Sequence, residues 1–297
     1  MNPLRVGYFA DGPWSHRALS KLNSDNLIEV AFICARSEKP DEILKSISSE
    51  QKIDFFTHPR VNSTEFFNLV SKYNCDLFVS MSFDQIFYRR LIDLPRLGII
   101  NCHAGKLPFY RGRNVLNWAL INDESEFGIT VHFIDEGIDT GDIILQRLYE
   151  INDSDDYSTL LMRSYQECSS ILYDAIKILQ NGSTKSIKQS DIDLYGSYCT
   201  ARVPGDEILE WNKNSRDIFN FVRSISRPGP EARTHFGDTE IKINKTIFLP
   251  NATKYVGIPG SVIGVEEKSF LVKTLDSFIR IIEWTGYPKP RIGDRFN

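Results

Sequence analysis

The chain has 297 residues, of which 41% are hydrophobic and 25% charged, and its formal net charge is −4. This composition is typical of a globular protein of roughly two domains and argues against a disordered or collagen-like chain and against a general attraction to polyanions. No stretch reaches the roughly 18–20 consecutive apolar residues of a membrane-spanning helix, and the start of the chain lacks the apolar core of a signal peptide, so we expect a soluble, cytoplasmic protein without membrane contact.

The first two-thirds of the chain alternates short apolar runs with helical patterns, which predicts βαβ units and a mostly parallel sheet. Strands are expected at Leu4–Phe9, Leu27–Cys34, Ile53–Phe56, Asp76–Met81 and Leu97–His103. Helices are expected from Asp11, as N-cap, to about Leu22, over Pro40–Ser48, and from Ser63 to near Tyr73.

A segment of different character follows at Leu107–Asn114, where Pro, Gly and two arginines come directly after a strand. In open α/β sheets ligands bind at that carboxyl end. A helix is expected over Val115–Asn122, and then two apolar stretches at Gly128–Ile134 and Ile143–Leu148. The segment between these stretches, DEGIDTGD, holds two glycines and four acids in eight residues, which predicts a loop.

The C-terminal part of the chain differs from the first two-thirds in its sequence pattern. Helical spacing predicts a long helix from Ser158 to Asn181, and a serine- and lysine-rich stretch without periodicity follows. One more helix, at Ser215–Ile225, precedes four short strands, at Glu240–Ile243, Gly260–Val265, Phe270–Thr274 and Phe278–Glu283. We expect an α/β domain at residues 1–190, a linker at 191–204, and a small antiparallel, OB-like β-barrel at 205–297.

Asn101, His103 and Asp139 form the candidate catalytic set. Asn101 and His103 are two residues apart at the end of a strand, so their side chains share one face. An amide beside an imidazole can polarise a carbonyl oxygen and move a proton, and a carboxylate stabilises the protonated imidazole. Their spacing alone is also compatible with another interpretation, in which Asn101 forms a turn and His103 has only a structural role.

Two long strings around these residues resemble the folate-dependent formyltransferases, in which an Asn-x-His strand end, a Leu-Pro-x-Tyr-Arg-Gly loop and an Asp-x-Gly segment occur together. They are INCHAGKLPFYRGRNVLNWALIN and GITVHFIDEGIDTGDIILQ. The segments GDEILEWNKNSRDIFNFVRSISRPGPEARTHFGD and GIPGSVIGVEEKSFLVKTLDSFIRIIE are similar to the C-terminal domain of methionyl-tRNA formyltransferase and of the bacterial enzyme that formylates UDP-linked aminoarabinose. The resemblance implies a Rossmann-like formyltransferase domain before the barrel.

The resemblance also implies residue roles. Asn101 would stabilise an oxyanion, His103 would act as general acid and base, and Asp139 would hold the imidazole in its charged form. The co-substrate would be 10-formyltetrahydrofolate, bound by Arg113, by the loop residues Asp135, Glu136, Gly137, Ile138 and Asp139, and by Ser82, Phe83 and Ile86. Substrate contacts are expected from Lys106, Tyr110 and Arg111.

This chain departs from the family pattern at two places. Many members have Ser-Leu-Leu-Pro after the histidine, whereas here Gly105-Lys106 precedes Leu-Pro, which adds a positive charge beside the cleft. The apolar loop expected around the pterin ring reads MSFDQIF. Outside the set, His132 alternates with apolar residues along a strand and is interpreted as a structural sheet residue, and Cys102 is expected to be buried and to point away from the site.

Charge separates two classes of acceptor. Residues 205–297 hold 14 Lys and Arg against 12 Asp and Glu, a net of +2, and residues 1–204 hold 21 against 27, a net of −6. Because phosphate contacts supply most nucleic-acid affinity, this balance disfavours tRNA and favours the amino group of a nucleotide-linked aminosugar. Methionyl-tRNA formylation is the alternative, and a folate-binding protein without turnover is a third. The sequence leaves a monomer and a homo-oligomer both open.

The five cysteines complete the sequence evidence. They are odd in number, widely scattered and without a Cys-x-x-Cys pair, which disfavours disulfides and a zinc ribbon, and we expect no metal site. The five are Cys34, Cys75, Cys102, Cys168 and Cys199.

Overall fold

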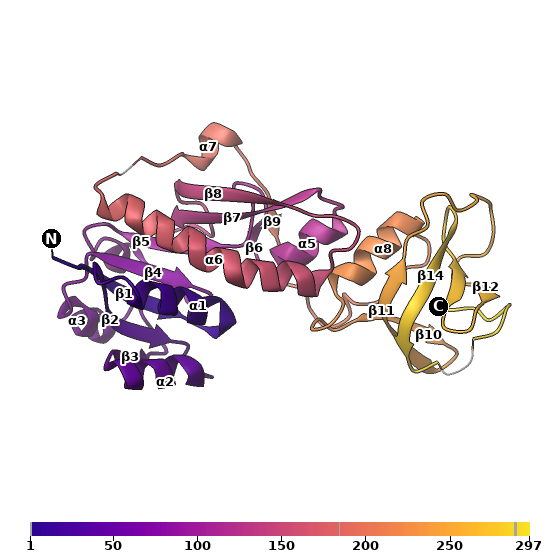
Figure 1. The fold of residues 1–297 in the computed structure, drawn as a ribbon, viewed down its shortest axis with the longest axis horizontal. Helices are drawn as coiled ribbons and strands as arrows, with labels where there is room; N and C mark the ends of the chain where they lie inside the picture. The colour runs from indigo at the N-terminus through magenta and orange to yellow at the C-terminus, as the bar shows by residue number, and fades with distance from the viewer. Residues whose placement is uncertain (1, 184, 288–289) are drawn as a thin grey trace. The chain divides into compact units, whose positions relative to one another are not determined.

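The structure, a computed structural model, describes residues 2–183, 185–287 and 290–297. The chain forms two compact units. The first comprises the residues up to Gly112 together with Phe127–Tyr149 and Met162–Cys199, and the second comprises Arg113–Glu126, Glu150–Leu161 and the residues from Thr200 onward (Figure 1). No helix in the described ranges is both long and apolar enough to cross a membrane.

A seven-stranded sheet forms the centre of the first unit, in the order β3-β2-β1-β4-β5-β7-β8. The pairs from β3 to β5 are parallel, and β5 pairs with β7 in the antiparallel sense, which confirms the predicted mostly parallel, Rossmann-like sheet. The strands are β1 Leu4–Ala10, β2 Ile28–Ala35, β3 Asp54–Thr57, β4 Leu77–Met81, β5 Ile99–His103, β7 Glu126–Phe133 and β8 Ile143–Glu150. A short pair, β6 Arg111–Gly112 and β9 Tyr198–Cys199, lies apart from this sheet in the hydrogen-bond pattern and is parallel.

Helices connect the strands and begin where the capping residues predict. The Asp41 and Ser63 side chains accept hydrogen bonds from the amides of Leu44 and Phe66, satisfying donors at the first turns of α2 and α3. Asp11 is the N-cap of α1 as predicted, but its side chain makes no capping hydrogen bond. The helices are α1 Gly12–Asn23, α2 Glu42–Gln51, α3 Thr64–Ser71, α4 Arg89–Ile92, α6 Tyr157–Gln180 and α7 Gln189–Ile192.

Aromatic side chains fill one core of this unit. Phe9 is buried at the centre of edge-on contacts with neighbouring rings, among them Phe78 at a centroid distance of 5.3 Å. On α6, buried Cys168 accepts a hydrogen bond at its carbonyl from the Cys102 thiol, 3.7 Å away. Figure 1 shows α6 running along the sheet. Cys102 is thus buried, as predicted, and all five cysteines are free thiols.

The second unit is a five-stranded antiparallel sheet in the order β10-β11-β14-β13-β12. Its last residues bridge the two edge strands: the Val262 amide donates to the Asp294 carbonyl, and the Asn297 amide donates to the His235 carbonyl. The sheet therefore closes through the chain end, as in a small barrel. Its elements are α5 Val115–Ile121, α8 Ser215–Ser224, β10 Ala232–Phe236, β11 Thr239–Ile247, β12 Val262–Val265, β13 Phe270–Lys273 and β14 Phe278–Thr285.

Helix α8 covers the core of this barrel. Ile218, Phe219 and Val222 lie on its buried face, among the inward side chains of the strands. Helix α5 belongs to the same unit, and the Asn117 amide on it donates to the Ser224 carbonyl at 2.5 Å. The sequence pattern did not indicate this grouping, because α5 lies far from the barrel along the chain. The boundaries at residues 190 and 204 stay predictions.

Candidate active site

The end of β5 and the facing part of β7 bring the first site residues together. In the antiparallel register Asn101 lies opposite His132, and His103 lies opposite Thr130. The Asn101 Nδ2 atom is 3.3 Å from His132 Nε2. The other nitrogen of His132, Nδ1, is 2.7 Å from the Phe133 carbonyl oxygen, so Nε2 is the ring atom that faces the site.

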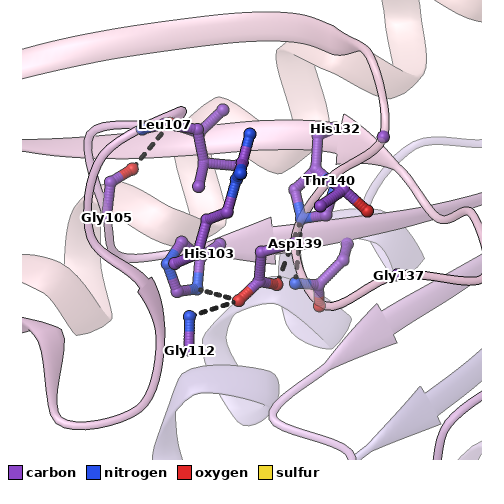
Figure 2. Close-up of polar contacts among 12 residues, drawn as sticks. His103, Gly105, Leu107, Gly112, His132, Gly137, Asp139 and Thr140 are labelled. Carbon is purple, nitrogen blue, oxygen red and sulfur yellow. Dashed lines mark hydrogen bonds and ion pairs between the residues drawn. The ribbon is translucent and has the colours of Figure 1, made fainter. Parts of the chain in front are cut away.

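Asp139 joins these residues from the loop between β7 and β8. One carboxylate oxygen lies 3.7 Å from His103 Nδ1, and the other lies 3.5 Å from His132 Nε2. The Gly112 amide donates a 2.8 Å hydrogen bond to the same carboxylate. Figure 2 shows Asp139 between the two imidazoles, with Gly112 beside it. The structure thus brings the predicted trio Asn101, His103 and Asp139 together.

The electrostatics of the cluster favour an ionised Asp139. Burial opposes its charge, but the positive charge of protonated His103, a hydrogen bond and charge from His132, and the Gly112 amide together lower the pKa of Asp139 below its ordinary value. His103 is 9% exposed, and its Nε2 lies 2.7 Å from the Tyr110 carbonyl oxygen. The two ring nitrogens of His103 thus lie near different oxygens, Nδ1 near the Asp139 carboxylate and Nε2 near the Tyr110 carbonyl.

Two glycines permit this arrangement. A Cβ atom at Gly105 would lie 2.4 Å from His103 Nε2, so a side chain there would displace the imidazole from its position. At Gly112 φ is +95°, and a Cβ atom would lie 2.4 Å from the Cys199 carbonyl oxygen. A side chain there would disrupt the β6–β9 pairing that presents the Gly112 amide to Asp139.

The geometry supports acid–base chemistry at a carbonyl group. The amide of Asn101 and the imidazole of His103 are hydrogen-bond donors on one face of β5, and such donors stabilise negative charge that develops on a carbonyl oxygen. Asp139 orients His103 and stabilises its charged form.

The residues predicted to bind folate come from two loops of the first unit and from Arg113. Ser82 follows β4 with φ of +59°, and its carbonyl accepts from the Arg36 guanidinium. Phe83 stacks on Phe87 at a centroid distance of 5.8 Å. Ile86 is exposed, and so is Arg113, which belongs to the other unit. Their contact with folate stays a prediction.

In the second loop the predicted residues build the turn that presents Asp139. The Asp135 carboxylate accepts from the Gly137 amide at 3.0 Å and from the Thr140 hydroxyl at 2.6 Å. Glu136, Gly137 and Ile138 are exposed at the tip. Asp135 therefore has a structural role whether or not it contacts a ligand.

The three predicted substrate residues differ in their surroundings. Lys106 and Tyr110 are half-buried beside the cluster, and the Tyr110 amide donates to Ser197 Oγ at 3.1 Å. Arg111 is 7% exposed, and its guanidinium donates to Gln189 and to the Tyr195 carbonyl. These bonds give Arg111 a structural role, and a contact of Arg111 with the substrate stays a prediction.

Sequence reasoning missed two residues of the site. His132 is not merely a sheet residue, because the β5–β7 register places its Nε2 atom against Asn101 and Asp139. That register was the missing information, since alternation along one strand does not identify the facing residue. Gln189 lies in a stretch without periodicity, and its contacts with Arg111 and Asp139 had no signal in the sequence.

Comparison with known protein families and sequences follows the same division of the chain. The profile described as formyl transferase matches residues 5–176, and the profile described as formyl transferase, C-terminal domain, matches residues 203–290. The methionyl-tRNA formyltransferase of Ruminiclostridium cellulolyticum is 29% identical over 81% of this chain and 76% of its own length. That of Pelotomaculum thermopropionicum is 30% identical over 84% of this chain and 77% of its own length.

Solved structures with a similar fold include sugar formyltransferases. WlaRD, a sugar 3N-formyl transferase solved with dTDP and 5-N-formyl-THF, gives a TM-score of 0.72 at 22% identity and covers 96% of this chain and 98% of its own. An N-formyltransferase from Helicobacter canadensis, in complex with folinic acid and dTDP-3-aminofucose, gives 0.70 at 19% identity, over 95% and 100%. At these identities the likeness shows a shared fold.

Proposed function

Because the chain belongs to the formyl transferase family, we propose that it transfers the formyl group of 10-formyltetrahydrofolate to the amino group of a nucleotide-linked aminosugar. The observation that carries the chemistry is the buried cluster at the end of β5, in which Asn101, His103 and Asp139 lie within hydrogen-bonding or ion-pair range of one another or of His132. The family supplies the reaction, and this cluster supplies the groups that the reaction needs.

Each residue has a defined task in this proposal. When bound, the folate donor supplies an activated formyl carbon for attack by the uncharged amine. Asn101 and protonated His103 stabilise the negative charge that develops on the formyl oxygen. Asp139 holds His103 in the charged form and in position. The bond between the formyl carbon and the folate nitrogen breaks as the sugar amide forms, so that tetrahydrofolate leaves. The proton that the amine releases passes to water, or to His103 once the imidazole has given its own proton to the departing nitrogen.

The loops at this edge of the sheet suit a folate. Phe83 and the half-buried Ile134 both pack against the aromatic cluster around Phe9, so the loops after β4 and β7 rest on a common apolar base. Ile86 and Ile138 are each more than half exposed. Apolar surface beside backbone polar groups is the kind of environment that binds a flat heteroaromatic ring such as a pterin.

Two observations support the sugar acceptor. The similar sugar formyltransferase structures extend over nearly all of this chain and of their own, and they were solved with dTDP and with dTDP-3-aminofucose, respectively. The chain is also acidic overall, and its C-terminal 93 residues, 205–297, carry a net charge of only +2. A nucleotide diphosphate needs few positive side chains, whereas tRNA binding needs many.

Methionyl-tRNA formylation is the second candidate, because the relatives with the sequence matches given above carry that activity in their names. Salt dependence separates the two. A tRNA-binding enzyme loses on the order of 10³-fold or more in affinity between about 50 and 200 mM salt, and a small diphosphate ligand loses much less.

A direct competition of acceptors tests the proposal. The protein is incubated with 10-formyltetrahydrofolate and either a panel of nucleotide-linked aminosugars or methionyl initiator tRNA, and products are analysed by mass spectrometry. We expect a formyl mass gain on at least one aminosugar, with thermal stabilisation of the protein by that compound. Formylation of the tRNA alone, with steeply salt-dependent tRNA binding, would replace the sugar proposal by the second candidate.

A further inference from the structure

Gln189 is a buried amide that links the two loops that meet at Asp139. It is the first residue of α7 and is 3% exposed. Its Oε1 accepts hydrogen bonds from Nε and Nη2 of Arg111, at 3.0 and 2.7 Å. Its Nε2 donates to the carbonyl oxygens of Asp139 and Gly141, each at 2.8 Å. These four bonds use the full hydrogen-bonding capacity of a glutamine side chain.

On one side, Gln189 holds the strand that presents the Gly112 amide. Arg111 immediately precedes Gly112, and its backbone amide donates to the Ser197 carbonyl at 3.0 Å. Its guanidinium is buried and held by Gln189 and by the Tyr195 carbonyl. Gly112 is therefore fixed by the side chain that precedes it as well as by the β6–β9 pairing, and its amide points at the Asp139 carboxylate, 2.8 Å away.

On the other side, Gln189 holds the turn that carries the carboxylate. Asp139 has φ of +54°, a left-handed conformation that is unfavourable for a non-glycine residue. Bonds to the carbonyls of Asp139 and Gly141 bracket this turn. Because Oε1 of Gln189 accepts from a cation, its amide group is polarised and becomes a stronger donor to these carbonyls.

We propose that Gln189 is a positioning residue for the reaction, which fixes the Asp139 carboxylate between His103 and His132 by tying the turn of Asp139 to Arg111. The inference rests on the proposed function for its effect on turnover. The claim that Gln189 orients Asp139 does not depend on which acceptor is formylated. A carboxylate displaced by about 1 Å interacts less with the two imidazoles and orients His103 less well, and misplacement of that size costs up to about 100-fold in rate.

Gln189→Asn is the variant that tests this role. It keeps the amide and the charge but shortens the side chain by one methylene, so that it no longer reaches from Arg111 to the Asp139 carbonyl. We expect kcat to fall by about 10- to 100-fold, with a smaller change in KM, because the loss concerns the reacting groups and not substrate binding. Gln180→Asn is the matched control, since the Gln180 amide also donates to a backbone carbonyl, that of Leu27.

Two further readouts separate positioning from simple stabilisation of the fold. First, adding Gln189→Asn to Asp139→Asn should lower kcat little further, because the carboxylate that Gln189 positions is already absent. Second, the NMR signals of the His103 and His132 rings should shift at fixed pH in Gln189→Asn relative to the wild type, because the carboxylate between the rings moves, and should be unmoved in Gln180→Asn. The chain has five histidines, so single substitutions assign these signals.

The outcomes divide cleanly. Fully multiplicative losses of kcat in the double variant, or unmoved His103 and His132 ring signals in a folded Gln189→Asn protein, would overturn the proposal. If Gln189→Asn does not fold, Gln189→Glu takes its place in the kinetic cycle, because it retains an acceptor for Arg111 and replaces the donors to the two carbonyls with a charged oxygen that repels them. The NMR measurement needs no substrate, so it tests Gln189 even if no aminosugar is formylated.

Discussion

Replacing Asp139 with asparagine removes a carboxylate that lies within 4 Å of two imidazoles and leaves the size of the side chain unchanged. For unit charges 3.7 Å apart, Coulomb's law gives about 1 kcal/mol in bulk water and about 4.5 kcal/mol at an effective dielectric constant of about 20. His103 and Asp139 are 9% and 14% exposed at their side chains, so the interaction lies between these limits.

These energies correspond to a wide but testable range of rates. At about 1.4 kcal/mol per factor of ten, the loss lies between about 5-fold and 10³-fold, and we expect kcat to fall on the order of 100-fold. Because the negative charge beside the His103 imidazole is lost, the pH–rate profile of Asp139→Asn should differ in shape from that of the wild type.

The assay is the initial rate of formyl transfer between about pH 5 and pH 9, for wild type, Asp139→Asn and a control. Asp142→Asn is a suitable control, since this carboxylate lies in the same loop and accepts a hydrogen bond from the Ser186 hydroxyl, at 3.1 Å. An Asp139→Asn enzyme with an unchanged profile and less than about threefold loss of kcat would refute the electrostatic role of Asp139.

Three further predictions concern other parts of the molecule. Asn101→Ala should lower kcat by about 10²- to 10³-fold with unchanged circular dichroism, and retention of a tenth of the activity would exclude the amide as a charge-stabilising donor. The pKa of Asp139 is lowered in the folded state, so its stabilising effect is present above the ordinary carboxyl range and is lost as pH falls. Urea unfolding should accordingly show a larger difference between wild type and Asp139→Asn at pH 7 than at about pH 3, and equal differences would contradict this linkage. Lys273 is 1% exposed, and its Nζ atom lies 2.6 Å from the Thr274 carbonyl oxygen. Lys273→Met should therefore reduce the free energy of unfolding by about 1–3 kcal/mol without lowering kcat. Parallel unfolding and rate measurements would check this result.

The sequence predicted the central sheet well because its signals are local. The apolar runs ending at Met81 and His103 are short, β-rich and followed by turn residues, and the structure has strands ending at both. Capping residues such as Ser63 likewise mark helix starts through bonds within a single turn. The identity of the site came from the motif around Asn101 and His103, which lie on one strand.

Interactions between segments that are distant in the chain could not be predicted from such local signals. His132 joins the site through the β5–β7 register, which depends on packing between strands about 30 residues apart. The family resemblance implied a substrate contact for Arg111, but it gave no sign that this charge is buried against Gln189, 78 residues away in the chain. Contacts of this kind follow from tertiary packing and leave no periodic signal.

Transfer of labelled formyl to an aminosugar tests the central claim most directly. Wild-type protein and His103→Ala are incubated with 10-formyltetrahydrofolate carrying ¹³C in the formyl group and with the nucleotide-linked aminosugar that stabilises the protein most. The account predicts ¹³C-formyl amide on the sugar nitrogen with wild type, and at least about 100-fold less with folded His103→Ala. Absence of label from every aminosugar with wild type, or equal labelling by the two proteins, would contradict it.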